Sequence, residues 1–376
     1  MLLVDSEGRY DRQELITWWN QEALRAARIL VVGAGALGNE VVKNLTLLGI
    51  GHITVVDMDS VSTSNLSRCV FFREGDEGQP KADLVAARAS ALNPDVKVIG
   101  IISTVQSQGV GWLAEFDLVI GCLDNREARV WVNQACRKFG LTWIDGAIEG
   151  IRGVVKVFPP VGPCYECTLG EVDRAILEKR KACSLLTEEE VELGKVPTNA
   201  TTSSVIAGLQ SQEAVRILNG MASPLNNRGW FIIGESFDSY TVDYQEDEWC
   251  PAHETYESRV LAPYESVQTL RSLVELFAPG AEAFEVEFES ILVRGGTCFE
   301  CNTKSTINRL VGAVSQKDVT CGGCAAVMGL DVTTVISNVD DLLDSTLAQL
   351  SIPFYDVVRI RTAETQVIVA FTGEKK

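Results

Sequence analysis

The sequence predicts an α/β fold, a doubly wound and mainly parallel sheet followed by a smaller α+β domain toward the C-terminus. Two observations support this prediction. Short apolar runs of strand character alternate with segments of helical apolar spacing as far as residue 145. The first of these runs, Arg28–Val32, leads directly into a glycine-rich turn, Gly33-Ala-Gly-Ala-Leu-Gly38. Because parallel strands need long crossovers, usually helices, this alternation indicates a sheet covered on both faces.

The expected elements follow this alternation along the chain. The first part has helices at 14–27, from the glycine turn to 48, at 81–92 and at 127–139, with strands at 28–32, 52–56, 97–102, 118–121 and 142–145. Next come a strand at 154–158, a helix at 201–218 and a hairpin of 230–233 and 239–244. The C-terminal part has helices near 267–277 and 339–350 and strands at 357–361 and 365–371. We expect one domain over 1–254, with a charged crossover at 170–196, and another over 262–376.

Composition and charge restrict the class of protein. The 376 residues are 46% hydrophobic and 22% charged, which favours packed cores over disorder. A net charge of −18 disfavours binding to the phosphate backbone of nucleic acids. No apolar run is long enough to span a membrane, and no secretory signal is visible. Because several of the 11 cysteines form CxxC pairs without such a signal, we expect a reducing cytoplasm.

The glycine turn indicates a nucleotide site. Glycines let the backbone approach phosphates, and the N-terminus of the following helix presents free amides and positive potential. Asp57 ends the next expected strand, where a carboxylate can accept hydrogen bonds from ribose hydroxyls. On their own, these features favour a dinucleotide-dependent oxidoreductase.

The residues that follow Asp57 favour ATP cleavage instead. Arg68 and Lys81 come after it, and Asp124 follows a later strand. Cleavage of ATP to AMP and pyrophosphate requires cations near the phosphates and a carboxylate that can hold Mg²⁺, whereas an NAD enzyme has no evident need of them. Taken singly, the three residues also suit a surface ion pair, a solvated helix start and a helix cap. Their joint occurrence in this order supports the ATP interpretation.

From Tyr10 to His253 the chain resembles the family of ThiF, MoeB and the ubiquitin-activating enzymes. The resemblance rests on Arg12-Gln13, the glycine turn, Asp57-x-Asp59-x-Val-x-x-Ser-Asn65-Leu-x-Arg68, Gly78-Gln-Pro-Lys81 and Asp124-Asn125. It implies a Rossmann-like adenylation domain in which Asp57 binds ribose and Asp124 holds Mg²⁺. The nucleotide site would further include phosphate contacts from Asn65, Arg68 and Lys81, together with Gly33, Gly35, Ala36, Gly38, Asp59 and Asn125. Arg12 resembles the arginine that family homodimers supply to the partner's ATP, although from the residues alone it is equally a surface charge.

Two sets of paired cysteines have the spacing of zinc ligands, so we expect two zinc ions per chain. Cys164-Tyr-Glu-Cys167 pairs with Cys250-Pro-Ala-His253, and each tight turn offers two ligands of a closed tetrahedral site. The resembled family usually has four cysteines here, so His253 is a departure. The second set, within a zinc ribbon at 298–324, is Cys298, Cys301, Cys321 and Cys324. The alternatives are a free cysteine pair with an unrelated histidine and a redox-active CxxC.

Cys183 is the candidate nucleophile. It stands in Lys179-Arg180-Lys181-Ala182-Cys183-Ser184, where nearby cations favour the reactive thiolate, and it is otherwise an ordinary surface thiol. The resemblance supports the first interpretation, because the reactive cysteine of ubiquitin-activating enzymes follows the zinc CxxC at a similar distance. We interpret Cys69, Cys122 and Cys136 as packing residues.

The resemblance is strongest to a bacterial ubiquitin-activating-type enzyme with an added C-terminal zinc-bearing domain. It implies a homodimer that uses ATP and Mg²⁺ to adenylate the C-terminal carboxylate of a ubiquitin-like β-grasp protein. Cys183 would then take the acyl group as a thioester and pass it to a conjugating enzyme. One alternative is activation of a sulfur carrier for thiamin or molybdopterin synthesis. A non-catalytic scaffold and an NAD oxidoreductase are the others, and the intact set of Arg68, Lys81 and Asp124 argues against both.

Overall fold

The structure, a computed structural model, describes residues 8–170, 173, 197–256 and 258–373. The chain forms two compact units. Among the described residues, the first unit comprises 8–105, 113–170, 173 and 197–255, and the second comprises 106–112, 256 and 258–373. Most of the expected crossover at 170–196 lies outside the described residues.

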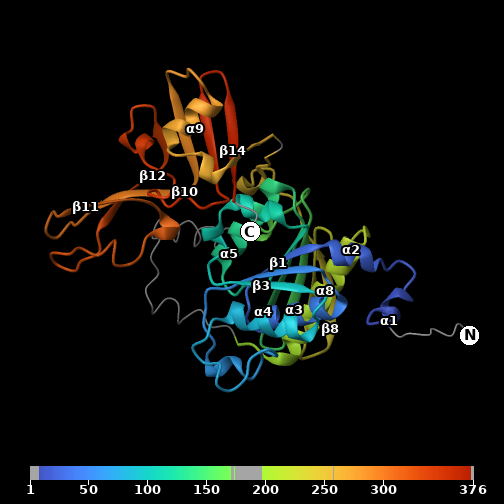
Figure 1. Cartoon of the computed structure of the whole chain (residues 1–376). Coiled ribbons are helices and arrows are strands. Elements are labelled where there is room, and N and C mark those ends of the chain that lie inside the picture. Colours follow the sequence, from blue (N-terminus) through green and yellow to red (C-terminus); the bar gives the residue numbers. More distant parts are fainter. Residues whose placement is uncertain (1–7, 171–172, 174–196, 257, 374–376) are drawn as a thin grey trace, which may run out of the picture. The chain divides into compact units, whose positions relative to one another are not determined.

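An eight-stranded sheet forms the centre of the first unit (Figure 1). Its strand order is β3-β2-β1-β4-β5-β6-β7-β8. Neighbours from β3 to β5 pair in parallel, and those from β5 to β8 pair antiparallel. This confirms the predicted doubly wound, mainly parallel sheet. The strands are β1 (Arg28–Val32), β2 (His52–Val56), β3 (Lys97–Ile101), β4 (Leu118–Gly121), β5 (Trp143–Glu149), β6 (Arg152–Phe158), β7 (Arg228–Ile233) and β8 (Asp238–Asp243).

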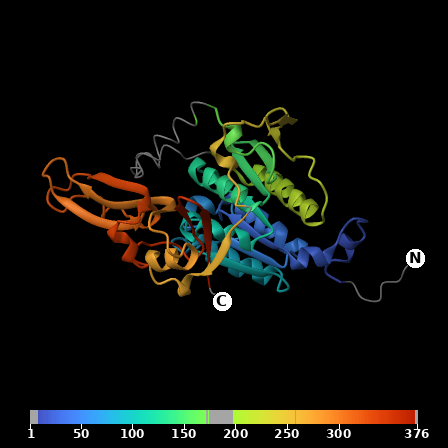
Figure 2. The ribbon, with the colours of Figure 1, turned by 90° about the horizontal axis from the view of Figure 1, so that it is seen from above.

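Helices cover both faces of this sheet (Figure 1; Figure 2 from above). On one face lie α3 (Ala36–Leu48), α4 (Lys81–Leu92) and α8 (Ala200–Leu218), with α3 packed against both of the others. On the opposite face lies α5 (Arg126–Phe139). The main core forms where the sheet meets α3 and α8, and it buries Ile29, Val31, Val41, Leu45, Ile206 and Ala214. Burial of the β1 side chains from Ile29 onward explains why this strand is a continuous apolar run.

The N-terminal prediction of one helix at 14–27 is wrong. The structure has two short helices, α1 (Asp11–Glu14) and α2 (Gln21–Ala26). Asn20 separates them because its backbone is extended and its side chain accepts a hydrogen bond from the amide of Ala23 at 3.1 Å, which starts a new helix. The apolar spacing that indicated one helix comes in part from Trp18 and Trp19, which pack against the core from the intervening turn.

The second unit has a six-stranded sheet and one α-helix among its described residues. Strands β11-β10-β13-β14-β9 are hydrogen-bonded neighbours in this order. β11 and β13 pair with different halves of one edge of β10, and β12 pairs with its opposite edge. The strands are β9 (Val260–Pro263), β10 (Phe284–Thr297), β11 (Lys304–Leu310), β12 (Gly329–Ser337), β13 (Val357–Thr362) and β14 (Gln366–Thr372). Helix α9 (Leu270–Phe277), capped by Thr269, buries Leu270 and Leu273 in this unit's core.

The predicted helix near 339–350 is also wrong. The structure has a single 3-10 turn there, Asp341–Asp344, and further turns up to residue 351. The leucines of this segment are buried as the pattern predicted, but polar side chains bond to the local backbone in place of a helical ladder. Asp340 accepts from the amide of Leu342 at 3.0 Å, and Thr346 accepts from that of Gln349 at 3.1 Å.

Among the described residues, no helix is long and apolar enough to cross a membrane.

Candidate functional site

The predicted nucleotide residues lie at the carboxyl ends of β1, β2 and β4. The strand order reverses between β1 and β4, because β2 and β3 continue on one side and β5 on the other. Ligands of doubly wound sheets bind in the crevice at such a reversal. The glycine turn at 33–38 follows β1, Asp57 follows β2, and Asp124 and Asn125 follow β4. The fold therefore brings residues far apart in the sequence to one edge of the sheet.

The glycines of the turn serve different purposes. Gly33 has a φ of +102°, and a Cβ there would lie 2.4 Å from the carbonyl oxygen of Cys122. A Cβ on Gly38 would lie 1.9 Å from the carbonyl oxygen of Gly33. Gly35 has an ordinary φ of −74°, and its Cβ would meet nothing within 4 Å. Packing thus explains Gly33 and Gly38, whereas Gly35 keeps open space directly before Ala36, the first residue of α3.

The Asp57 carboxylate ties β2 to the glycine turn. Its Oδ2 accepts a hydrogen bond from the amide of Ala34 at 2.6 Å, and its Oδ1 accepts one from the amide of Asp59 at 2.7 Å. Burial raises the pKa of Asp57, although these amides and the positive charge of Lys81 act in the opposite direction. The carboxylate is therefore fixed beside the turn, where its remaining lone pairs can accept hydrogen bonds from ribose hydroxyls.

Lys81 lies close to Asp57 and Asp59. Its Nζ is 2.7 Å from Asp59 Oδ2, and its side chain is 11% exposed while that of Asp59 is 55% exposed. Arg68 donates from Nη1 to the carbonyl of Ser64 at 2.7 Å, within its own turn. Asn65 is buried, and its Oδ1 accepts from the amide of Ser62 at 2.9 Å. Lys81 can thus supply a positive charge at this edge, and Asn65 shapes the turn that carries Arg68.

Sequence reasoning missed a further residue of this region, Asn39 in α3. This fully buried side chain donates to the carbonyl of Ala34 at 2.8 Å and accepts from the amide of Phe71 at 2.9 Å. It therefore links the glycine turn to the segment that follows Arg68. An amide on the buried face of an apolar helix was the only signal of this role in the sequence.

The loop after β4 is organised by Asn125 and Arg129. Asn125 caps α5 by accepting from the amide of Ala128 at 2.8 Å, so the cap role considered for Asp124 belongs to its neighbour. Asp124 is exposed. Arg129, which sequence reasoning missed, donates to the carbonyl of Leu123 at 2.6 Å and pairs with the buried Asp145 at 3.0 Å. The loop that carries Asp124 is thus fixed on both sides while its carboxylate stays open to a cation.

The first set of predicted zinc ligands comes together in the first unit. Cys164 Sγ lies 3.7 Å from Cys167 Sγ and 3.6 Å from Cys250 Sγ, and Cys167 Sγ lies 3.2 Å from His253 Nε2. All four ligand atoms lie within 4.8 Å of one another. Tetrahedral zinc with bonds of about 2.3 Å to sulfur separates its sulfur ligands by roughly 3.8 Å. The donor set and its spacing therefore fit one zinc ion.

The second set comes together within the second unit, beside β10, β11 and β12. The Sγ atoms of Cys298 and Cys324 are 3.4 Å apart, and those of Cys301 and Cys321 are 3.5 Å apart. These four ligand atoms also lie within 4.8 Å of one another. Cys298 and Cys321 are buried, and the other two are exposed. Four thiols at tetrahedral spacing fit a second zinc ion.

The two remaining residues predicted to be catalytic are Cys183 and Arg12. Cys183 lies outside the described residues. Arg12 lies in α1 and is exposed.

Cys69, Cys122 and Cys136 are buried, as their interpretation as packing residues predicted. Burial raises the pKa of Cys69 to about 11, and it also raises the pKa values of Cys122 and Cys136.

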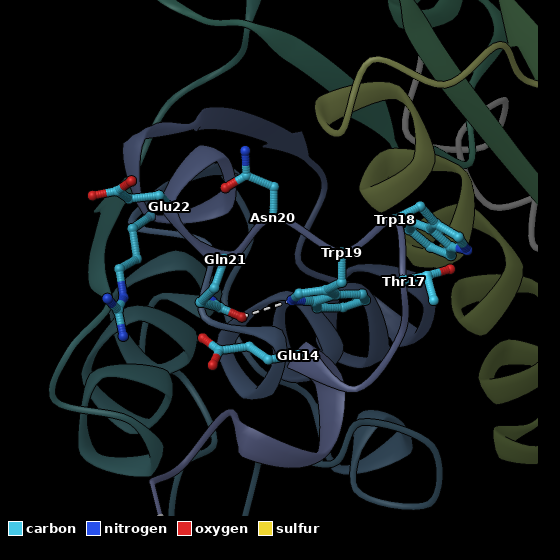
Figure 3. A pocket seen from close by; sticks show the side chains of 8 residues that line it. Glu14, Thr17, Trp18, Trp19, Asn20, Gln21 and Glu22 are labelled. Carbon is cyan, nitrogen blue, oxygen red and sulfur yellow. Dashed lines mark hydrogen bonds between the residues drawn. The ribbon is translucent and has the colours of Figure 1, made fainter.

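An open hollow of about 630 Å³ lies beside the turn between α1 and α2 (Figure 3). Trp19 lines it and donates from Nε1 to Gln21 Oε1 at 2.9 Å, and the carboxylates of Glu14 and Glu22 also line it. No residue predicted to bind the nucleotide lines it. The residues predicted to bind the nucleotide therefore lie at the end of the parallel sheet and not in this hollow.

Known proteins resemble this chain in amino-acid sequence. Residues 10–252 match the ThiF family. The SAMP-activating enzyme E1 of Haloferax volcanii is 34% identical over 238 residues, which cover 61% of this chain and 82% of that protein. The molybdopterin-synthase adenylyltransferase of Escherichia coli is 30% identical over 244 residues, covering 63% of this chain and 90% of that protein.

Solved structures resemble it in fold. Escherichia coli MccB in its crystal structure with ATP has a TM-score of 0.55 at 22% identity, and the match covers 67% of this chain and 75% of that one. At this identity the likeness concerns the fold. The family match spans more than half of the chain and includes the glycine turn, the segment from Asp57 to Lys81, Asp124 and the three cysteines of the first cluster. The chain therefore belongs to the ThiF family, within the group that includes MoeB and the E1 activating enzymes.

Proposed function

We propose that this protein uses ATP to adenylate the C-terminal carboxylate of a ubiquitin-like β-grasp protein. The observation that carries the proposal is the joint placement of the open turn at Gly35, the Lys81 ammonium and the Asp124 carboxylate around one end of the parallel sheet. Family membership and the names of the two relatives support it. An NAD oxidoreductase has no use for this combination of a lysine and an exposed carboxylate beside the phosphates.

The proposed chemistry is an attack on the α-phosphate of ATP. An oxygen of the tail carboxylate forms a bond to the α-phosphorus, the bond to the bridging oxygen breaks, and pyrophosphate leaves with both electrons. Asp57 would hold the ribose, while Lys81 and Arg68 would stabilise the negative charge that develops on the phosphates. Asp124 would hold Mg²⁺, which neutralises phosphate charge when bound. Asp59, 2.7 Å from Lys81, would orient its ammonium.

We further propose that Cys183 receives the acyl group. Its thiolate would attack the carbonyl carbon of the adenylate, AMP would leave, and the resulting thioester would retain enough transfer potential for a conjugating enzyme. Activation of a sulfur carrier is the second candidate, because one relative is named molybdopterin-synthase adenylyltransferase. Both candidates share the adenylation step and differ only in the fate of the adenylate.

The two cysteine clusters would each hold a structural zinc ion. All four positions of each cluster are protein ligands, which is typical of structural sites and unlike catalytic sites that keep one position open. We also propose a homodimer in which Arg12 serves the partner's ATP. Mixing inactive Arg12→Ala and Asp124→Ala proteins should then restore part of the activity, because one site of each mixed dimer keeps both residues.

ATP–pyrophosphate exchange stimulated by a β-grasp partner tests the adenylation proposal. Asp124→Ala should abolish Mg²⁺-dependent exchange while leaving the far-UV circular dichroism spectrum unchanged, because Asp124 is exposed and Asn125 caps α5. Asp238→Ala on the exposed edge strand β8 is the matched control and should exchange normally. Normal exchange in Asp124→Ala would refute the assignment.

A further inference from the structure

The first cysteine cluster contains one imidazole, and a carboxylate lies on the far side of its ring. His253 Nε2 faces Cys167 Sγ at 3.2 Å. His253 Nδ1 lies 3.4 Å from Glu246 Oε1. The two nitrogens therefore have different partners, a sulfur of the cluster and an acid outside it.

We propose that Glu246 is a positioning residue of this metal site, holding the proton of His253 on Nδ1 so that Nε2 is the ligand. A neutral imidazole carries one N–H and one free lone pair, and only the lone pair can bind a metal ion. An ionised carboxylate accepts hydrogen bonds, so Glu246 favours the tautomer that is protonated at Nδ1. That tautomer leaves the Nε2 lone pair directed at the sulfur cluster. Outer carboxylates that act on histidine ligands in this way fix the ring and strengthen the ligand.

Two neighbouring side chains, Arg137 and His253, contact the Glu246 carboxylate. Arg137, on α5, is 8% exposed, and its Nη2 is 3.6 Å from Glu246 Oε1. The same guanidinium donates from Nη1 to the carbonyl of Gly162 at 2.9 Å, just before Cys164. One arginine thus connects the turn that supplies the first two ligands with the segment that supplies the last two. Glu246 itself is half-exposed at 48%, so its position depends on Arg137 and His253.

The backbone beside Glu246 also contacts the cluster. The backbone of Asp247 forms a hydrogen bond with the Cys167 thiol. The segment that carries Glu246 therefore packs directly against the ligands. The inference rests on the proposed zinc site and does not depend on the adenylation reaction.

Zinc release from the purified full chain tests this role. With excess chelator and a metal-sensitive dye, Glu246→Ala should release one zinc ion per chain about 10–100-fold faster than wild type. Glu246→Gln, which keeps an acceptor oxygen, should stay closer to the wild-type rate. Glu248→Ala, an exposed acid of the same segment, is the matched control and should release zinc at the wild-type rate. The ion of the second cluster should be unaffected in every variant.

A double-mutant comparison separates the effect on His253 from the ion pair with Arg137. In a His253→Cys background no imidazole remains, but Arg137 still pairs with Glu246. Glu246→Ala should then change zinc release by less than about threefold. An equally large acceleration in both backgrounds would overturn the proposal and assign Glu246 to the Arg137 contact alone.

Nitrogen NMR of protein labelled with ¹⁵N-histidine gives an independent readout, because the chain has only two histidines. We expect His253 to show a metal-bound Nε2 and a slowly exchanging Nδ1 proton that exchanges faster in Glu246→Ala. A metal-bound Nδ1 would overturn the proposal. Fewer than two zinc ions per wild-type chain would refute the proposal of two zinc sites. If no zinc is bound at His253, this inference is refuted as well. Full zinc content with unchanged release in Glu246→Ala would refute the role of Glu246 alone.

Discussion

Arg129 Nε lies 3.0 Å from Asp145 Oδ1, and the exposures of the two residues are 8% and 1%. The pair joins the start of α5 to β5, across the end of β4. Burial opposes the charge on Arg129, but Asp145, Tyr165 and Asp124 together outweigh this effect and raise the pKa of Arg129. Because the same guanidinium also holds the carbonyl of Leu123, the pair fixes the loop that carries Asp124.

Arg129→Ala should reduce both stability and activity. It leaves the buried Asp145 carboxylate without its partner, and breaking a buried pair in this way costs about 3–5 kcal/mol. It also frees the carbonyl of Leu123, so exchange activity should fall in the protein that remains folded. Urea unfolding and ATP–pyrophosphate exchange measure the two effects.

The control for this prediction is Arg126→Ala, one turn before Arg129 on the same helix. Arg126 pairs with Asp173 at the surface, where its side chain is 49% exposed. An exposed pair contributes about 0–1 kcal/mol, so stability should change little. If both variants lost the same stability, the Arg129–Asp145 pair would not have the structural importance assigned to it.

Gly35 and Gly38 give a second prediction, because the same substitution should have opposite effects at the two positions. Gly35→Ala places a methyl group in open space at an ordinary φ, so the urea midpoint should stay unchanged. The methyl group would occupy the space that we propose for phosphate, and the KM for ATP should rise about tenfold. Gly38→Ala should destabilise the fold by about 1–3 kcal/mol or more, because its Cβ would clash with Gly33 at 1.9 Å. An unchanged KM in Gly35→Ala would contradict the proposed approach of the nucleotide.

The placement of Asp57 and Asp124 at one edge of the sheet could be predicted from the sequence because each follows a strand. Asp57 and Asp124 come immediately or shortly after apolar runs, and parallel strands bring such positions to one edge whatever their separation in sequence. The Arg129–Asp145 and His253–Glu246 relationships could not be predicted in this way. Each depends on the distance and direction of two side chains, which only the folded packing determines.

The second unit shows the same limit at the level of strands. Sequence reasoning found β13 and β14, whose apolar residues alternate or run together, but it missed β9, β11, β12 and the longest strand, β10. That strand is 14 residues long, and its register shifts between Val293 and Gly295. A Cβ on Gly295 would lie 2.1 Å from the carbonyl oxygen of Ser305. The glycine that reads as a break in the sequence is there required by the close approach of β11.

The second cysteine cluster gives a third prediction. Elemental analysis should find two zinc ions per chain in wild-type protein and one in a variant with Cys301→Ser and Cys324→Ser. Both residues are exposed, and the cluster lies in the second unit. Exchange activity should therefore stay within about twofold of wild type, because the nucleotide residues all belong to the first unit. Retention of both zinc ions in this variant would show that these cysteines are not ligands.

The buried cysteines of the first unit are poor candidates for the proposed acyl acceptor. The thiolate is the nucleophilic form, and burial raises the pKa of Cys69 to about 11. Burial likewise raises the pKa of Cys136. Seven further cysteines belong to the two clusters. With Cys122 also buried, elimination among the 11 cysteines of the sequence supports Cys183 as the proposed nucleophile.

Cys183→Ala therefore separates the two proposed functions. With ATP, Mg²⁺ and the correct β-grasp partner, wild-type protein should form a covalent adduct that a thiol reductant removes, because a thioester is cleaved by thiols. Cys183→Ala should lose this adduct and keep pyrophosphate exchange, since adenylation uses only the residues at the end of the parallel sheet. Cys69→Ala is the control and should keep both. An adduct in Cys183→Ala would place the nucleophile elsewhere. If wild-type protein forms only the adenylate, this result would favour activation of a sulfur carrier, in which the adenylate itself is the product passed on.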